Sequence, residues 1–286
     1  MASSPLIARS LAFLLLLAPA PLLPRAQASD APADGLVQRA LAAELRSARD
    51  PQHPMRYRLR KASPRFSSTK EIIETKDGAV ARLVAINDQA LSPVDEQKEQ
   101  ARLDGLLQDP SRQRHRKQVE DADANRAMKV LRMLPQAFTY TYAGAETGPG
   151  GKLQKYTFRP NPNFDPPDLE TQVLTAMQGA IWIDPVQARV ARLEGHLIRD
   201  VDFGWGILGR LYRGGWIVIE QEDVGNHQWR TVRFQMVMSG RVLFKPRVFD
   251  TVQEQTQFSP MPVGLDYVQA IRMLRAGPEN ARVTRR

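Results

Sequence analysis

The stretch from Gly179 to Phe244, GAIWIDPVQARVARLEGHLIRDVDFGWGILGRLYRGGWIVIEQEDVGNHQWRTVRFQMVMSGRVLF, holds all four tryptophans of the chain and decides the fold. Its short segments alternate apolar and polar residues and are separated by turns that contain glycine or proline, which is typical of antiparallel strands. The pattern predicts a meander of five strands, at Gly179–Asp184, Arg189–Ile198, Ile207–Arg213, Trp216–Val224 and Trp229–Phe244.

The alternation within these strands also predicts which side chains share a face of the sheet. Successive side chains of a strand point to opposite faces. One predicted face is apolar, with Ala191, Leu193, Gly195 and Leu197 on one strand and Val232, Phe234, Met236 and Met238 on another. The opposite face carries the polar residues, such as Arg233 and Gln235, so one face of the sheet is expected to be covered.

Outward from the meander, the same signals place further strands and helices. Strands are predicted at Met55–Arg60, at Ser68–Lys76 and Ala79–Asn87 with a two-residue turn at Asp77-Gly78, at Phe138–Tyr142, at Leu153–Arg159 and at Val248–Thr256. Helices are predicted at Asp34–Ala48, Ser92–Leu107, Ser111–Leu134 (ended by Pro135) and Asp266–Arg275. The expected fold is therefore α+β, a curved and predominantly antiparallel sheet of about nine to eleven strands with the first three helices packed on one face.

The first 28 residues have the features of a secretory signal peptide: Arg9, the apolar run Leu11–Leu17, and a cleavage site at Ala26-Gln27-Ala28. An uncleaved anchor is the alternative, but the apolar run is short for a bilayer span and is followed by Pro19, Pro21 and Pro24. We therefore expect a periplasmic protein with a signal peptide at 1–28 and a single domain at 29–286, which carries a helical insertion at about 92–134.

Composition bounds the function. The chain has 286 residues, is 42% hydrophobic and 25% charged, and carries a formal charge of +9, which becomes +7 without the first 28 residues and their Arg9 and Arg25. A basic surface favours anionic partners, among them an anionic membrane surface. The charged start of the third predicted helix, Arg112–Asp121, is either a solvated face or a surface for anionic lipid or a partner. We expect no nucleic-acid partner.

Signatures of catalysis and metal binding are missing from the sequence. Without cysteine there is no thiol nucleophile, disulfide or zinc–thiolate site, and no hydrolase elbow, metalloprotease motif or phosphate-binding loop is present. The four histidines stand far apart in the sequence, and Asn161, Asn163, Asp165 and Asp168 lack the spacing of a calcium loop. The sequence therefore predicts no catalytic residue, no metal site, no cofactor and no enzymatic activity, with a hydrolase as the least favoured class.

Two segments carry a resemblance to a known superfamily: Gly-x-x-Trp-Ile-Asp at Gly179–Asp184 and Arg-Val-x-Arg-Leu-Glu at Arg189–Glu194. Together with the order of elements, they resemble the periplasmic lipoprotein-carrier superfamily, the Lol-type outer-membrane lipoprotein-sorting proteins, and most of all its uncharacterised secreted relatives. The resemblance implies an unclosed half-barrel whose helices form a lid over an apolar cavity on the concave face. It assigns no ligand contact to a particular residue of this chain.

These observations favour a non-enzymatic carrier or sensor that binds lipid or the acyl chains of a lipoprotein. The alternative is a cell-envelope interaction protein whose core is filled and whose surface binds a protein partner or anionic headgroups. If the apolar face lines a cavity, methionines suit flexible ligands. The residues then expected to line it are Tyr140, Tyr142, Trp182, Leu193, Leu197, Trp216, Phe234, Met236 and Met238.

Overall fold

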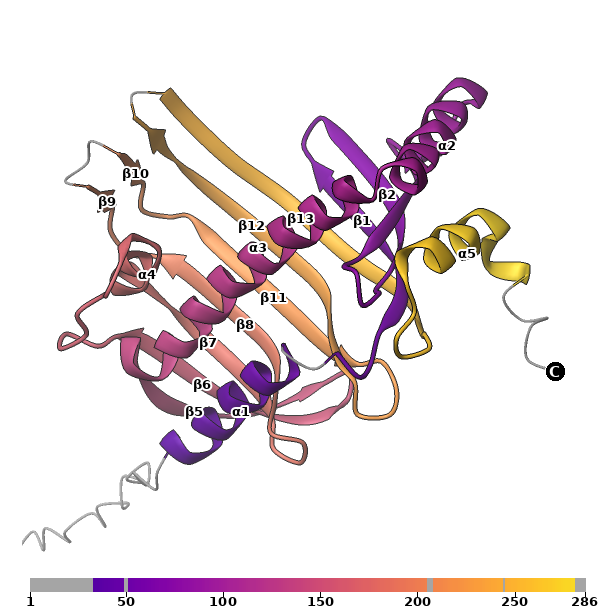
Figure 1. The fold of residues 1–286 in the computed structure, drawn as a ribbon. Helices are drawn as coiled ribbons and strands as arrows, with labels where there is room; N and C mark the ends of the chain where they lie inside the picture. Colours follow the sequence, from indigo (N-terminus) through magenta and orange to yellow (C-terminus); the bar gives the residue numbers. More distant parts are fainter. Residues whose placement is uncertain (1–32, 49–50, 205–207, 244, 281–286) are drawn as a thin grey trace, which may run out of the picture. The chain divides into compact units, whose positions relative to one another are not determined.

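The computed structural model describes residues 33–48, 51–204, 208–243 and 245–280, so the expected signal peptide lies outside the described residues. Within them, thirteen strands form one antiparallel sheet in the order β4-β3-β2-β1-β13-β12-β11-β8-β7-β6-β5, and β10 pairs with β12 and β9 (Figure 1). The outermost strands β4 and β5 do not pair with each other. The predicted α+β fold with an unclosed half-barrel is thus confirmed.

The expected number of about nine to eleven strands is too low, because the sequence predicts neither of the short strands β4 and β9. The strands are β1 Met55–Ser63, β2 Phe66–Ile73, β3 Val80–Ile86, β4 Gln89–Ala90, β5 Phe138–Gly148, β6 Gly151–Pro160, β7 Met177–Asp184, β8 Arg189–Leu197, β9 Val201–Phe203, β10 Gly209–Leu211, β11 Trp216–Asp223, β12 Trp229–Val242 and β13 Lys245–Pro260. The helices are α1 Ala33–Ser47, α2 Pro93–Gln108, α3 Pro110–Ala137, α4 Leu169–Gln172, the 3-10 helix η1 Val173–Ala176 and α5 Tyr267–Asn280.

One turn and one helix end differ from their predictions. The loop between β2 and β3 runs from residue 74 to 79 instead of being a two-residue turn. The reason is local hydrogen bonding, because the Thr75 hydroxyl donates to the Gly78 carbonyl (2.6 Å) and accepts from the Asp77 amide (3.1 Å). Pro135 lies inside α3 and does not end it, and the helix continues to Ala137, which is fully buried.

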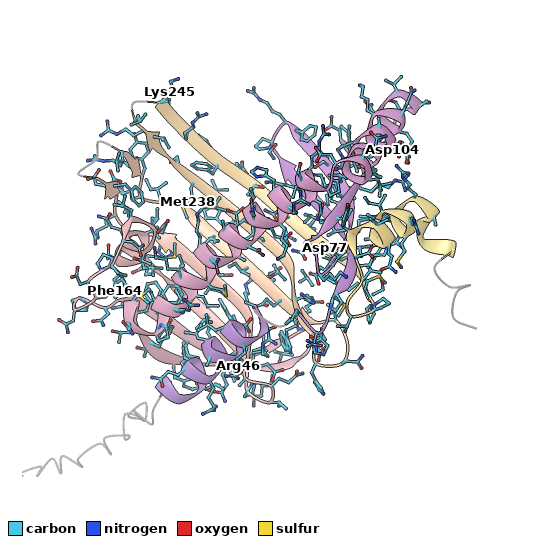
Figure 2. The ribbon with its side chains drawn as sticks, viewed as in Figure 1. Arg46, Asp77, Asp104, Phe164, Met238 and Lys245 are labelled. Carbon is cyan, nitrogen blue, oxygen red and sulfur yellow. The ribbon has the colours of Figure 1, made fainter. Side chains whose placement is uncertain are left out.

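The helices are divided between two regions of the sheet. We call the face that carries α1, the second half of α3 and η1 the inner face, and the other the outer face. Four α1 residues form a core with Tyr156, Ile181, Ile183 and Val190. The η1 residue Ala176 packs with Leu197, Val201 and Met238, the last of which is labelled in Figure 2. The predicted orientation of Phe234, Met236 and Met238 toward the helical side is confirmed by the register of β11 and β12.

The expectation that α2 also covers this face is wrong. Its Leu103 and Leu106 pack with α5 around Ile73 and Val80, and its polar residues lie along β3 beyond the short β4 pairing. There Glu99 accepts the amide of Leu83 (2.8 Å), and Arg102 donates to the carbonyl of Ala81 (2.5 Å). An exposed strand edge offers unpaired backbone groups to other chains. The role of α2 is therefore to satisfy the free edge of β3.

Candidate functional site: the inner face beneath α3

A row of directly opposed residues crosses the inner face from one end of the sheet to the other. Opposed residues in antiparallel strands point to the same face. From β5 to β2 the row is Tyr142, Tyr156, Ile181, Leu193, Ile219, Phe234, Gln253, Lys61 and Ser68. The row is apolar or aromatic over its first six strands and polar over its last three, so the inner face has an apolar and a polar end.

A second row runs beside the first and shows the same change. It consists of Tyr140, Phe158, Gly179, Gly195, Ile217, Met236 and Thr251. Gly179 and Gly195 lie opposite each other, and a Cβ added to Gly179 would lie 1.8 Å from the carbonyl oxygen of Glu194. At its polar end the buried hydroxyl oxygen of Thr251 has no hydrogen-bond partner among the described residues. The glycine pair leaves the centre of this row without side chains.

The helices cover the two ends of the apolar region and leave its middle open. The α1 core buries Ile181, and the η1 cluster buries Leu197 and Met238. Between them, Ile217, Ile219, Phe234 and Met236 are only half-buried. We call these four side chains the apolar strip. The side chains of a filled core are almost fully buried, so the helices cover the strip less completely than they cover Ile181, Leu197 and Met238.

Helix α3 crosses the inner face over this region, in front of β8, β11 and β12 (Figure 1). It has 28 residues and is therefore about 42 Å long. Residues 118–127 are all exposed, so nearly three turns of the helix bury no face against the sheet. Several of them are small, namely Ala122, Ala124 and Ala127. Helix α3 is therefore a bridge whose middle does not pack on the strands.

Both ends of this bridge are anchored. At the β2–β3 end, the Gln113 amide donates to the Asp77 carbonyl (2.9 Å) and Glu120 accepts the Ala79 amide (2.9 Å). At the other end, Met133 and Leu134 pack with Phe138 and Phe158. The anchors lie on β2–β3 and β5–β6, so α3 spans β1, β13, β12, β11, β8 and β7.

An ion pair adds to the second anchor. Lys129 of α3 lies 2.8 Å from Asp168 and 2.9 Å from Glu170, which belongs to α4. The hydrogen bond from Lys129, with those from the amide and hydroxyl of Thr171, lowers the pKa of Asp168 to about 2. Asp168 is therefore charged at neutral pH and serves as the N-cap of α4.

The structure brings together seven of the nine residues expected to line a cavity. Six of them, Tyr140, Leu193, Leu197, Phe234, Met236 and Met238, lie on the inner face, and Tyr142 lies there at the exposed edge strand β5. Burial raises the pKa of Tyr140, whose hydroxyl donates to the Leu134 carbonyl (3.1 Å). This hydroxyl is thus held by α3, whereas the sequence predicts it near a polar mouth.

The expectation for Trp182 and Trp216 is wrong, because both lie on the outer face. Trp182 packs with Leu153 and Ala180, and its strand neighbours Ile181 and Ile183 face α1. Trp216 pairs with His196, whereas Ile217 pairs with Gly195 on the inner face. Two bulges also change which side chains of a strand face inward. One lies in the β7–β8 pair at Trp182/Ile183, and the other lies in the β11–β12 pair at Glu220/Gln221. They place Ala191 and Val232 on the outer face, contrary to the simple alternation.

A polar pocket on the outer face was not predicted from the sequence. It has a volume of about 680 Å³ and is bordered by β5, β6, β7, β8, β11 and the start of β12. Trp182 forms part of its wall, and its indole N–H donates to Glu146 (2.7 Å) while Lys155 and Arg192 lie over its ring. Six carboxylates line this pocket against one arginine: Glu146, Asp184, Glu194, Glu220, Glu222, Asp223 and Arg192. Only the register of the bulged strands brings these residues together.

The polar loop before α4 has a structural role. Asn161 donates to the Gln136 carbonyl (2.9 Å) and accepts the Asn163 amide (3.0 Å). Among the described residues, no three acidic or histidine side chains are gathered so that they could hold a metal ion. In the same part of the chain, no helix is both long and apolar enough to span a bilayer.

Comparison with known proteins finds similarity in fold only. No family model and no curated protein matches the chain. A domain from Vibrio parahaemolyticus, described as an outer membrane lipoprotein-sorting protein domain, has a TM-score of 0.33 and 8% identity over 81% of this chain and 96% of its own. A DUF1329 family protein from Desulfovibrio piger has a TM-score of 0.29 and 11% identity, with 82% and 95% covered.

A third structure, MucB in complex with MucA(peri), has a TM-score of 0.22 and 11% identity over 76% of this chain and 93% of that chain. The first of these structures has the kind of description that the expected Lol-type resemblance names, at 8% identity and a TM-score of 0.33. No residue role is transferred from these structures, and the site described above rests on the contacts of this chain alone.

Proposed function

We propose that this protein is a non-enzymatic carrier or sensor in the periplasm that binds lipid or the acyl chains of a lipoprotein between α3 and the inner face. The observation that carries the proposal is the apolar strip: Ile217, Ile219, Phe234 and Met236 are half-buried although a 28-residue helix crosses their face of the sheet. Burial of apolar surface against an acyl chain contributes about 25 cal/mol per Å².

The geometry of α3 supports the same function. A helix that filled a core would present a continuous apolar stripe to the sheet. The middle of α3 instead presents small and charged residues, and all ten residues from 118 to 127 are exposed. An acyl chain bound beneath would contact Met236 and Phe234 on one side and, on the other, Ala124 and Ala127, which share the side of α3 that carries Gln113 and Leu131. Methionine adapts to ligands of variable shape.

The experiment uses the mature protein purified from the periplasm of its expression host without added lipid. Native mass spectrometry followed by lipid analysis of the extracted ligand should find bound lipid, or uptake of one lipid per chain after equilibration with phospholipid in detergent micelles. A protein that stays empty under both conditions, while its tryptophan emission and chemical shifts do not change, would contradict the proposal and favour a filled core.

The second candidate is an envelope interaction protein, and the outer-face pocket favours it. Its carboxylates outnumber its single arginine on a chain with a charge of +9. Such a pocket suits a cationic side chain of a partner protein that contacts the walls around Trp182. The two candidates use opposite faces, so Glu222→Gln and Asp223→Asn should weaken a partner that binds there and leave lipid uptake unchanged.

A further inference from the structure

The polar end of the inner face carries positive charge. Beyond Phe234, the first row continues to Gln253 on β13 and Lys61 on β1. In the adjacent row, Leu59 lies opposite Lys70 of β2, which lies opposite Leu83 of β3. Strands are about 4.8 Å apart, so three steps from β12 to β2 place Lys70 roughly 14 Å across the sheet from Phe234. An amphiphile on this face would meet apolar and cationic groups in succession.

A pocket of about 270 Å³ lies at this cationic end, lined by Lys70, Ala81, Leu83, Glu99, Arg102 and Arg116. Arg116 belongs to the first third of α3 and Lys70 to the sheet, so the pocket lies between the bridge helix and the strands. Its lining holds three cations and one carboxylate. It is therefore a local excess of positive charge at the end of the apolar strip.

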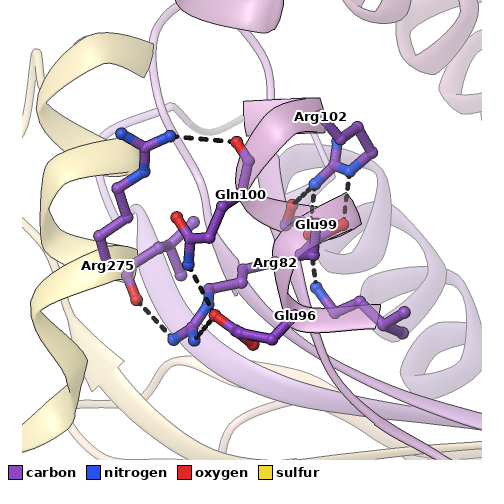
Figure 3. A network of polar contacts seen from close by, with 9 residues as sticks. Arg82, Glu96, Glu99, Gln100, Arg102 and Arg275 are labelled. Atoms are coloured by element: carbon purple, nitrogen blue, oxygen red, sulfur yellow. Dashed lines mark hydrogen bonds and ion pairs between the residues drawn. The ribbon is translucent and has the colours of Figure 1, made fainter. Parts of the chain in front are cut away.

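The single carboxylate of the pocket, Glu99, already accepts three hydrogen bonds. Glu99 accepts the Leu83 amide at 2.8 Å and hydrogen bonds from Nε and Nη2 of Arg102, both at 2.7 Å (Figure 3). Neither Lys70 nor Arg116 forms a hydrogen bond or ion pair with another described residue. The Lys70 ammonium and the Arg116 guanidinium are therefore free to donate hydrogen bonds to an anion. An anion would also offset the repulsion among the three cations.

The electrostatics agree with this geometry. Partial burial and then the neighbouring Arg102 and Arg116 lower the pKa of the Lys70 ammonium. Burial and then Arg102 lower the pKa of Arg116, and the charges of Glu120 and Glu99 only partly oppose the change. Both groups are thus in surroundings that disfavour their charge, which is the condition that a bound anion relieves.

We propose that this pocket binds the phosphate group of an anionic phospholipid, with Arg116 and Lys70 as its donors, while the acyl chains lie along the apolar strip. This inference rests on the proposed function, because the strip must take the chains for the headgroup to reach the pocket. A zwitterionic lipid has the same phosphate, but its ammonium group would be repelled by the three cations. The pocket therefore selects lipids by headgroup.

The test is a competition. The full mature protein is equilibrated with detergent micelles that contain equal amounts of phosphatidylglycerol and phosphatidylcholine with identical acyl chains, and the retained lipids are quantified after gel filtration. Because the ammonium group of phosphatidylcholine would lie near three cations and the glycerol of phosphatidylglycerol carries no charge, we expect an enrichment of phosphatidylglycerol of about tenfold. The ratio should fall close to one in Arg116→Gln and in Lys70→Gln, while total retained lipid stays within about twofold of wild type.

Arg114→Gln is the matched control. Arg114 is exposed, lies two residues away on the same helix and does not line the pocket, and glutamine has nearly the helix propensity of arginine. It should keep the enrichment. A ratio near one in the wild type, a ratio that Arg116→Gln does not change, or an equal fall in Arg114→Gln would overturn the headgroup inference but leave lipid retention itself intact.

A separate titration with sodium phosphate distinguishes a free anion from a headgroup. If the wild type retains no lipid at all, the proposed function fails and the headgroup inference fails with it. If inorganic phosphate then binds and Arg116→Gln abolishes that binding, the pocket is a site for the free ion, and the phospholipid assignment is overturned.

Discussion

At the scale of single residues, Arg56 and Glu71 form a buried ion pair on the outer face, and the more exposed Arg58 joins it. Arg56 and Glu71 lie 2.6 Å apart, with side chains 9% and 8% exposed, and Arg58 lies 3.0 Å from the same carboxylate. Burial raises the pKa of Glu71, but the hydrogen bonds from Arg56 and Arg58 outweigh it and bring the pKa below its ordinary value. This carboxylate joins β1 to β2 across the sheet.

Glu71→Gln should therefore lower the free energy of unfolding at pH 7 by about 3 kcal/mol, because it leaves the Arg56 guanidinium buried without its counter-ion. A lowered pKa contributes stability that is complete above the ordinary glutamate pKa of about 4.3 and is lost as the pH falls through the lowered value. The difference between variant and wild type in urea denaturation should thus shrink below about pH 4.3.

Glu222→Gln, at an exposed position without an ion pair to any residue that the structure describes, is the control for this experiment and should change stability by less than about 0.5 kcal/mol. A loss in Glu71→Gln that is equally large at pH 7 and pH 3.5 would show that packing, and not charge, determines the effect.

Single residues also mark how far the sequence could predict the site. Alternation along β12 places Phe234, Met236 and Met238 on the inner face correctly, since that part of the strand is regular. Trp182 and Trp216 were misassigned because large aromatic residues fit either face and the bulges are set by pairing with neighbouring strands. The pocket between Lys70 and Arg116 joins β2 to α3, and no local pattern brings two such distant residues together.

At the scale of elements, helix α3 is a bridge: it is held at its two ends and is not packed on the sheet along its whole length. Its bounds were predicted to within a few residues, and its charged start is consistent with a solvated face. Its exposed middle could not be predicted, because Ala122, Ala124 and Ala127 fit a close-packed helix interface as well as an open one. Only the anchors at Gln113 and Met133 show that the helix is held at its two ends.

Amide hydrogen exchange tests this bridge. Residues 121–127, beyond the anchor at Glu120, should exchange at least about tenfold faster than residues 128–134, since they are all exposed and a tenfold difference requires only about 1.4 kcal/mol less opening free energy. Saturation with phospholipid should slow exchange in the middle segment more than in the C-terminal one. Equal exchange along the whole of α3, with or without lipid, would contradict the bridge.

The elements at the other end of the sheet have a different role. Helix α2 has the length and capping that its sequence predicts, with Ser92 accepting the Asp95 amide, yet it lies along the edge of β3 and not over the inner face. Its sequence could not show this, because Glu99 and Arg102 look like an ordinary i, i+3 pair on a helix surface. Their backbone partners on β3 are what give them an edge-covering function.

At the scale of the whole domain, thirteen strands in one unclosed sheet leave a wide inner face that the helices cover only in part. Helix α3 crosses that face, and the register of the strands places the apolar strip and the cationic pocket at successive positions across the sheet. This arrangement accounts for a long helix that packs at its ends alone. It also separates the proposed lipid site from the carboxylate-rich pocket on the outer face, so the two surfaces can be tested independently.

The most direct test of the central claim compares Met236→Glu with Gln235→Glu, adjacent positions of β12 that face opposite sides of the sheet. With an open strip, Met236→Glu should unfold cooperatively within about 1.5 kcal/mol of wild type, because its carboxylate can reach water, yet lose lipid retention, while Gln235→Glu retains lipid. Loss of cooperative folding in Met236→Glu, together with a wild-type protein that never retains lipid, would show a filled core and contradict the account.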